Sequence, residues 1–314
     1  MIGTVIVSFN SAKFLDDSIR AAARFTHEVV VVDNASEDDS VEVAARAGAK
    51  VLSNPVNRGF AAAVNQGVRS LRSEFALILN PDTVLVNSPA PLAEACQLPG
   101  VGAAAGRLAG PDGHTQTGFT VRRLPTTWTL SFEALGINRV WPSNPVNRSY
   151  RCLDLDLRVA QQVEQPAGAF LLFSKKTWEE LGGLDESFHP VWFEDVDLLA
   201  RMQAANLMVW YDPDVVASHH GGHSVSQLDP GIRQTYWYGN LLRYAAKHFS
   251  PFGFRATAAA AAAGCVIRWA ATGIREYGSL AWLAGARVFG AAPAVRLSIG
   301  HELKKETKEE MQGC

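Results

Sequence analysis

The sequence has few cysteines and no paired cysteine motif. Its four cysteines, Cys96, Cys152, Cys265 and Cys314, are widely spaced and form no C-x-x-C pair. This scatter argues against a structural zinc site and against a disulfide framework. It is typical of a protein from the reducing cytoplasm.

An excess of charge and a long apolar segment are missing as well. The formal net charge of -2 creates no general field that would attract nucleic acid, so we expect no nucleic-acid partner. Residues 2–7 reach polar Ser8 too soon for a signal peptide. The longest uncharged stretch of the C-terminal part, 256–267, is too short to span a bilayer.

What is present is a globular composition with a regular strand and helix alternation. The chain has 314 residues with 47% hydrophobic and 19% charged residues, which predicts one main catalytic domain with an appendage. Short apolar runs predict strands at 2–7, 28–32, 50–53 and 75–79, and helical spacing predicts helices at 12–25, 40–47 and 61–71. This order predicts a doubly wound, mostly parallel α/β sheet with a nucleotide-binding N-terminal half.

The rest of the chain has a less even pattern. From 100 to about 162 it indicates strands and loops, which we interpret as an acceptor-facing insertion of about 100–165. Further strands are predicted at 167–174 and 208–211, and helices at 175–181, 194–205 and 230–249. The predicted division is a catalytic domain, 1–228, and a helical C-terminal region, 229–314.

Polar residues follow each predicted strand of the N-terminal half, at the edge where such sheets bind ligands. Asp33 is placed to accept hydrogen bonds from a base or ribose, or else caps the next helix. Asp82, in Asn80-Pro81-Asp82, is suited to a divalent cation that also binds substrate phosphates, or else caps a proline turn. Arg58 and Gly59 begin a helix where backbone N–H groups can approach an anion, although small residues there also favour close packing.

Acids and histidines gather in two later segments. Glu194, Asp195 and Asp197 open a predicted helix, where acids ordinarily complement the helix dipole. The adjoining Trp192 and Phe193 favour a functional interpretation, a sugar-binding wall beside a base. The segment Ser218–Ser224 holds three histidines and two glycines, which indicates a metal or diphosphate site without matching a structural zinc pattern.

Taken together, these segments resemble family 2 glycosyltransferases, and most closely the bacterial rhamnosyltransferase-like branch. The matching segments occur in the family's order over about residues 4–225: VIVSFNS, VVDNAS, NRGFAAAVNQG, LILNPDTVL, PAGAFLLFSKKTWEELGGLDESFHPVWFEDVDL and ASHHGGHS. The resemblance implies the A-type glycosyltransferase fold and an inverting, metal-assisted sugar transfer.

The resemblance also implies roles for single residues. It places Asn80 and Asp82 at the metal-binding element, with the neutral Asn80 where the family usually has Asp. It makes Asp195 the general base of an acidic pair with Glu194, and it puts His219, or its neighbour His220, near the metal and diphosphate. The implied nucleotide-sugar pocket comprises Ser8, Asn10, Asp33, Asn34, Arg58, Gly59, Asn80 and Asp82.

The branch implies dTDP-rhamnose as donor, Mg²⁺ or Mn²⁺ as cofactor, and a cell-envelope polysaccharide or lipid-linked sugar as acceptor. A UDP-hexose donor is the alternative within this class. A sugar nucleotidyltransferase would need a Gly-rich basic N-terminal loop, which Val5–Asn10 does not provide. A non-catalytic sugar-binding protein would have no need of the acids at 82 and 195.

The C-terminal stretch 252–290 combines alanine with aromatic residues and arginines at helical spacing. Such helices either lie in a membrane interface or pack on the catalytic domain, because both arrangements share one periodicity. We therefore expect a cytoplasmic enzyme, with peripheral contact at the inner face of the membrane as one alternative.

Overall fold

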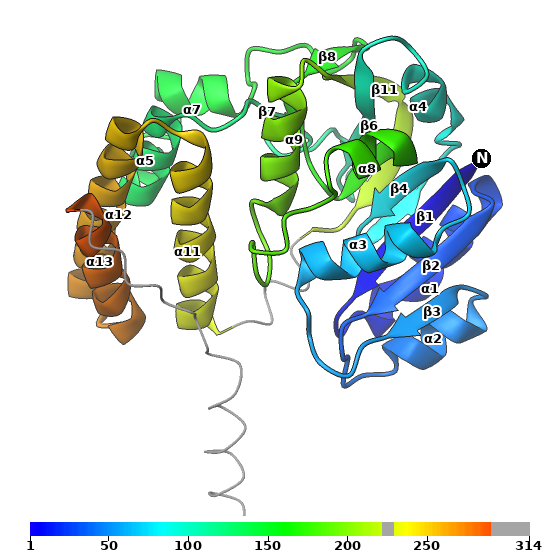
Figure 1. Ribbon diagram of the computed structural model, residues 1–314, viewed down its shortest axis with the longest axis horizontal. Coiled ribbons are helices and arrows are strands. Elements are labelled where there is room, and N and C mark those ends of the chain that lie inside the picture. The colour runs from blue at the N-terminus through cyan, green and yellow to red at the C-terminus, as the bar shows by residue number, and fades with distance from the viewer. Residues whose placement is uncertain (222–228, 290–314) are drawn as a thin grey trace, which may run out of the picture.

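The computed structural model describes residues 1–221 and 229–289 and is organised around one twisted sheet (Figure 1). Within these residues the sheet has nine strands in the order β3-β2-β1-β4-β10-β6-β11-β5, with β8 beside β11. Its first four strands pair in parallel: β1 (Ile2–Ser8), β2 (Glu28–Asp33), β3 (Lys50–Ser53) and β4 (Phe75–Leu79). The predicted parallel N-terminal unit is therefore confirmed.

Amphipathic helices connect these strands, as the spacing predicts. They are α1 (Ala12–Phe25), α2 (Ser40–Arg46) and α3 (Phe60–Ser70). Helix α1 buries Leu15, Ile19 and Ala22, which share one face at spacings of four and three residues. Helix α3 begins after Gly59, whose φ of 82° is a left-handed conformation that glycine adopts readily.

The second half of the sheet is mixed. Strand β10 (Phe170–Ser174) pairs antiparallel with β4 and with β6 (Val101–Ala109). Strand β11 (Met208–His219) is parallel to β6 and antiparallel to β5 (Thr83–Leu85) and β8 (Gln161–Val163). The helices on this side are α4 (Ala90–Ala95), α8 (Lys175–Glu180) and α9 (Glu194–Ala204).

The segment 100–162 contains strands and loops, as predicted, but also three helices that were not predicted. Strand β6 is an inner strand of the sheet, although its Ala-Gly-rich sequence has a single β-branched residue, Val101. Three helices follow it, α5 (Thr127–Leu135), α6 (Ile137–Val140) and α7 (Pro145–Tyr150). Side-chain N-caps begin two of these helices. The Thr126 side chain accepts from the N–H of Thr129 at the start of α5, and Asn144 caps α7. A short two-stranded sheet, β7 (Val121–Arg122) with β9 (Gln165–Pro166), completes the segment.

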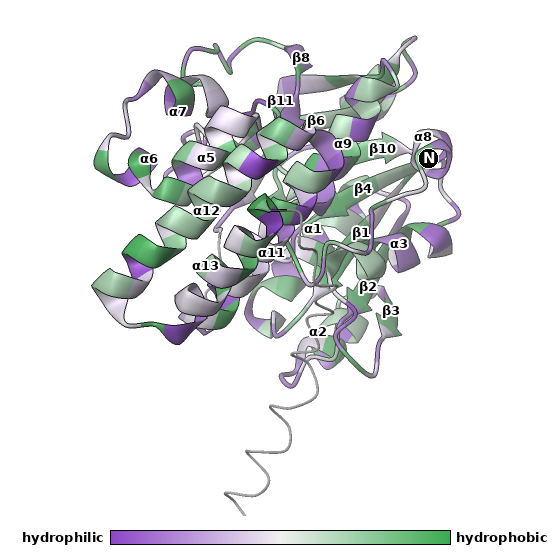
Figure 2. Cartoon of the chain, turned by 60° about the vertical axis from the view of Figure 1, so that its left-hand side comes forward, coloured by the Kyte–Doolittle hydropathy of each residue, from purple (hydrophilic) through white to green (hydrophobic). Residues whose placement is uncertain are grey.

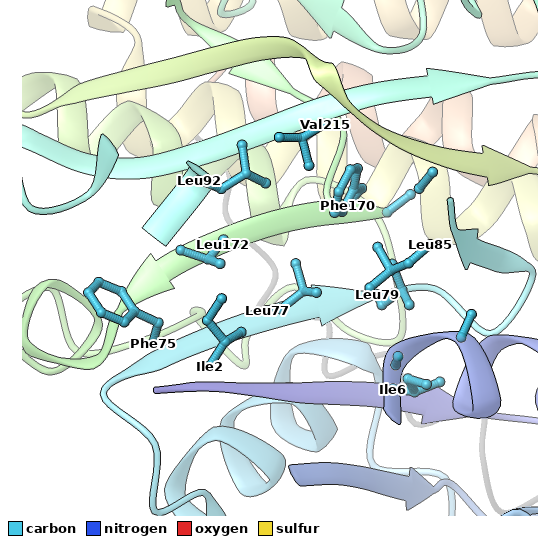
Figure 3. Close-up of a cluster of buried hydrophobic side chains, with 14 of the residues drawn as sticks. Ile2, Ile6, Phe75, Leu77, Leu79, Leu85, Leu92, Phe170, Leu172 and Val215 are labelled. Atoms are coloured by element: carbon cyan, nitrogen blue, oxygen red, sulfur yellow. The ribbon is translucent and has the colours of Figure 1, made fainter. Parts of the chain in front are cut away.

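Alternate residues of the strands fill two cores on opposite faces of the sheet. Ile2 and Ile6 point to one face and Val5 and Val7 to the other, because successive side chains of a strand alternate. Figure 3 shows the first core, in which side chains from β1, β4 and β10 meet those of Leu92 and Val215. Burial on both faces makes the sheet a firm support for the loops at its edges.

A third core holds the C-terminal helices α11 (Pro230–His248), α12 (Pro251–Thr272) and α13 (Arg275–Val288). They lie beside α5 and in front of the sheet when that side is turned forward (Figure 2). Arg268 of α12 donates hydrogen bonds to the backbone oxygens of Ala134 and Glu133 at the end of α5. None of the helices in the described part of the chain is long and apolar enough to span a membrane.

Candidate functional site

A cavity of about 730 Å³ opens between the sheet and the helices of the third core. Strand ends supply one side of it, with Asn34 after β2 and Asp82 after β4. The start of α9 and the segment before it supply another. The predicted site residues that line the cavity are Asn34, Asn80, Asp82, Trp192, Phe193, Glu194, Asp195 and His219.

Asp195 presents its carboxylate to this cavity from the first turn of α9. The backbone N–H of Gly168 donates to its Oδ2 at 3.1 Å, and the N–H of Val196 donates to its Oδ1 at 2.8 Å. Burial raises the pKa of Asp195, while these two hydrogen bonds and the positive charge of Arg122 oppose the rise. A carboxylate held in one orientation with a raised pKa is suited to accept a proton.

Glu194 stands beside it in a more apolar setting. Its side chain is buried, and its Oε2 has no hydrogen-bond partner within the described residues. Burial and the neighbouring Asp195 raise the pKa of Glu194 well above its ordinary value. The two acids therefore differ in environment: Asp195 is anchored by the backbone, and Glu194 has an oxygen free for a ligand.

The backbone just before the pair adopts an unusual conformation. Trp192 and Phe193 have φ values of 77° and 72°, in the left-handed region that side chains larger than glycine rarely occupy. Both lie in the cavity wall, and the Phe193 ring also packs against Tyr244 of α11, with ring centroids 5.7 Å apart. Such strain is maintained by surrounding contacts and is concentrated at functional sites.

Asp82 and His219 meet at the other side of the cavity. Nε2 of His219 lies 3.6 Å from Oδ1 of Asp82, and the N–H of Gly221 donates to Oδ2 at 3.1 Å. Gln116 holds the histidine from behind, because its Oε1 lies 2.8 Å from Nδ1 and its Nε2 donates to the backbone oxygen of His219. Burial lowers the pKa of His219, and the charge of Asp82 opposes this.

The two adjacent histidines lie in different surroundings. His219 is buried against Asp82, whereas His220 is exposed and its ring lies 5.5 Å from that of Phe14. His223 and Ser224, which belong to the same predicted segment, lie outside the described residues. Asn80 lines the cavity beside this pair, and its backbone oxygen accepts from Thr83 in a turn.

The remaining residues of the predicted nucleotide pocket support the loops behind the cavity. Both carboxylate oxygens of Asp33 accept from Ser36, and Oδ1 of Asn10 accepts from the N–H of Glu37. Asn34 lines the cavity and also donates to the backbone oxygen of Gly59. Ser8 is buried, Arg58 is exposed, and neither belongs to the cavity wall.

Several cavity residues were missed by sequence reasoning. Most come from the segment whose pattern is weak or from α11, and the adjacent basic and aromatic residues Arg122-Arg123 and Tyr150-Arg151 were the available signal. The missed polar and aromatic residues of these parts are Gln116, Phe119, Arg122, Glu133, Tyr150, Arg151, Gln165 and Trp237, and the N-terminal half adds Phe9 and Phe60.

Known proteins resemble this chain in sequence and in fold. The family model described as "Glycosyl transferase family 2" matches residues 4–150, which include most of β1, all of β2 to β4, and Asp82. The chain is thus similar to glycosyl transferase family 2 over residues 4–150. It is also similar to the N-acetylglucosaminyl-diphospho-decaprenol L-rhamnosyltransferase of Mycobacterium tuberculosis. The two are 25% identical over 248 residues, which are 73% of this chain and 79% of that protein.

Solved structures agree on the A-type glycosyltransferase fold. The mannosyltransferase PcManGT from Pyrobaculum calidifontis, in complex with GDP-Man and Mn²⁺, covers 99% of this chain and 80% of its own, with a TM-score of 0.52 and 18% identity. GalNAc-T7, with UDP, GalNAc and Mn²⁺, covers 78% of this chain and 47% of its own, with a TM-score of 0.55 and 15% identity.

Proposed function

We propose that this glycosyltransferase moves rhamnose from dTDP-rhamnose to a hydroxyl of a cell-envelope polysaccharide or lipid-linked saccharide, with inversion at the anomeric carbon. The observation that carries the proposal is the placement of one backbone-anchored carboxylate, Asp195, in the same cavity as Asp82 and His219. The choice of donor rests on the rhamnosyltransferase relative from Mycobacterium tuberculosis.

Asp195 acts as the general base in this proposal. Its carboxylate takes the proton from the acceptor hydroxyl while the hydroxyl oxygen attacks the anomeric carbon. The bond from that carbon to the diphosphate breaks in the same step, so that the nucleoside diphosphate leaves and the configuration inverts. Glu194, kept in an apolar setting, lies next to the reacting groups, and Trp192 and Phe193 form the wall against which a sugar ring packs.

Asp82 and His219 would hold a divalent cation, Mg²⁺ or Mn²⁺. The described residues contain no cluster of three or more His, Cys, Asp or Glu that could hold a metal by itself. One carboxylate and one imidazole still fit a cation that takes its other ligands from the donor diphosphate and water. The Gln116 side chain binds Nδ1 of His219, so that Nε2 faces Asp82. A hydrogen bond to the second ring nitrogen is the usual support for a metal-binding histidine. Such a cation stabilises the negative charge on the leaving diphosphate.

A panel of nucleotide sugars tests the donor and the base. With magnesium or manganese present, dTDP-rhamnose is expected to raise the melting temperature more than UDP-glucose, UDP-galactose or UDP-N-acetylglucosamine, because a ligand of the native state stabilises it. A clear preference for a UDP-sugar would establish the alternative, a UDP-hexose-dependent transferase.

The Asp195→Asn variant tests the base. It should bind the same donor and lose transfer by about 10²-fold or more. Transfer at the wild-type rate would remove Asp195 from the role.

We also propose that the C-terminal helices bring the enzyme to a membrane surface. Four aromatic side chains of this region are 50% to 88% exposed, namely Phe252, Trp269, Trp282 and Phe289. Aromatic rings at a membrane interface lie at the level of the headgroups. A lipid-linked acceptor, as named for the mycobacterial relative, would be presented at such a surface.

A further inference from the structure

Two arginines of the cavity wall point to the same atom. Nε of Arg122, at the end of β7, donates to the backbone oxygen of Gly118 at 2.8 Å. Nη1 of Arg151, which follows α7, reaches the same oxygen at 3.5 Å. Their guanidinium groups therefore converge, although the residues are far apart in the sequence and come from different elements.

Neither guanidinium is neutralised by an acid. Among residues 1–221 and 229–289, no carboxylate forms an ion pair with Arg122 or Arg151. Their neighbour Arg123 contrasts with them, because both of its Nη atoms bind Asp154, at 3.1 and 2.9 Å. Two unpaired, partly buried guanidinium groups in a cavity repel each other and favour an anion between them.

The surroundings fix this pair in place. The Arg122 guanidinium lies 5.7 Å from the ring centroid of Phe119 and 5.8 Å from that of Tyr150, so two aromatic faces hold it. Arg151 donates from Nε to Oδ1 of Asn147 at 3.0 Å. Side chains restrained in this way lose little conformational freedom when they bind a ligand.

The position of Arg122 relative to the acids of the cavity indicates which of the two substrates carries the anion that the arginines would bind. Arg122 pairs with Gln165 of β9, three residues before Gly168, whose N–H holds the proposed base Asp195, and the charge of Arg122 opposes the rise of the Asp195 pKa. This arrangement puts Arg122 on the same side of the cavity as the base, where the acceptor hydroxyl would lie. The donor diphosphate has its own site at Asp82 and His219. The cavity carboxylates other than Asp82, namely Asp195, Glu194 and Glu133, disfavour a free anion but suit a ligand that combines hydroxyls with a phosphate.

We infer that Arg122 and Arg151 form a subsite for the phosphate or diphosphate of an anionic acceptor, next to the hydroxyl that is glycosylated. The inference rests on the proposed glycosyl transfer and adds to it the chemical class of the acceptor. A planar guanidinium binds two phosphate oxygens at once, so a pair of them is suited to a diphosphate.

Binding of decyl diphosphate to the full-length chain tests the subsite without turnover. The protein is first saturated with dTDP and Mn²⁺, so that the donor site is filled, and decyl glucoside serves as the neutral probe. Each of the variants Arg122→Gln and Arg151→Gln is expected to weaken decyl diphosphate binding ~10- to 100-fold, because charge-assisted hydrogen bonds are lost. Arg151→Lys should recover part of the affinity.

The control is Arg148→Gln, which removes an exposed arginine from α7 outside the cavity wall. It should leave binding of decyl diphosphate unchanged. The inference is overturned if the Arg122 and Arg151 variants bind decyl diphosphate like the wild type, or if they weaken dTDP binding instead, which would assign the pair to the donor. Equal losses for decyl glucoside would also overturn it, because a collapsed cavity would affect both probes. If dTDP itself does not bind, the proposed function fails. The titration with decyl diphosphate can still be carried out in that case and tests the arginine subsite separately.

Discussion

Gly168 and Asp195 are fitted to each other. The N–H of Gly168 donates to Oδ2 of Asp195 at 3.1 Å, and a Cβ added to Gly168 would lie only 2.7 Å from the same oxygen. The hydrogen bond orients the carboxylate, and the missing side chain makes the approach possible. A glycine at this position is thus required by the carboxylate and not by a turn, because its φ is not among the positive values.

The Gly168→Ala variant should transfer sugar ~10- to 100-fold more slowly, because the added methyl group displaces the carboxylate from its position. Donor affinity should stay near the wild-type value, since Asp82 and His219 are not touched. Steady-state kinetics with a donor titration measures both. Gly285→Ala is a matched control in α13, where an added Cβ meets nothing within 4 Å. An unchanged rate in Gly168→Ala would show that the orientation of Asp195 does not limit transfer.

The raised pKa of Asp195 predicts the shape of the pH profile. A base acts in its ionised form, so transfer should decline as pH falls through a pKa above the ordinary value of 3.8. Arg122→Gln removes a charge that lowers this pKa and should shift the decline to higher pH. Since folding raises the pKa, ionisation of Asp195 costs stability as pH rises, and Asp195→Asn should raise the melting temperature at neutral pH. If transfer by the wild type and by Arg122→Gln declined only near the ordinary pKa of 3.8, the assignment of Asp195 as the base would be contradicted.

Asp82 should govern the metal dependence of donor binding. Asp82→Asn is expected to weaken donor affinity in the presence of Mn²⁺ by about 10-fold or more, because the carboxylate ligand is lost. Gln116→Leu should weaken it in the same direction, since the orientation of His219 is no longer held. Calorimetry with and without Mn²⁺ measures this, with Asp17→Asn on the exposed side of α1 as control. Equal affinities with and without metal in the wild type would leave Asp82 as a turn residue.

Asp197, two residues after the base, has a structural role. Its buried carboxylate binds Arg201, Lys247 and His248 at 2.9, 2.8 and 2.7 Å, and so links α9 to α11. Burial favours its protonated form, but hydrogen bonds from His248 and Lys247 hold the pKa of Asp197 below its ordinary value. Its stabilisation is therefore present above that ordinary value and lost as pH falls towards the folded-state pKa.

We expect Asp197→Asn to lower the free energy of unfolding by about 3 kcal/mol, because Arg201, Lys247 and His248 lose their buried carboxylate partner. Urea unfolding measures the loss, and donor affinity should remain. Asp16→Asn, which breaks an exposed pair with Arg20, should leave the urea unfolding midpoint nearly unchanged. If Asp197→Asn were stable and failed only in transfer, Asp197 would compete with Asp195 for the role of base.

The fold was predictable where local pattern and burial agree. Valine-rich β2 and amphipathic α1 lie within a residue of their predicted bounds, because each has one clear period. Strand β6 was missed because alanine and glycine carry no strand signal, and it is a strand through its partners β10 and β11. For the site, the acids and His219 stood in recognisable motifs, whereas Arg122, Arg151 and Gln116 acquire their roles only from contacts distant in sequence.

The last prediction concerns the C-terminal helices, which have two different faces. One face packs on α5: a Cβ at Gly264 of α12 would lie only 2.0 Å from the backbone oxygen of Ala134, and Arg268 binds the same oxygen. Deleting residues 251–289 would therefore uncover the third core and unfold its surroundings. Substitutions at the opposite face are the sharper test of membrane contact.

Trp269 and Trp282 are 50% and 69% exposed, so Trp269→Ser and Trp282→Ser together should leave the melting temperature nearly unchanged. If these rings enter the headgroup region, the double variant should cosediment with anionic liposomes several-fold less than the wild type, since burial of each large aromatic contributes to interfacial binding. Trp128→Ser, which removes a 70% exposed aromatic side chain from α5, serves as the control for loss of an aromatic.

The arginines of these helices divide into two groups. Arg287 is partly buried, which lowers its pKa, and Arg268 is bound to Ala134, whereas the side chains of Arg255 and Arg275 are exposed and can meet lipid phosphates. Binding should then weaken with salt, and wild-type protein that does not sediment at low salt would leave the helices as packing elements alone.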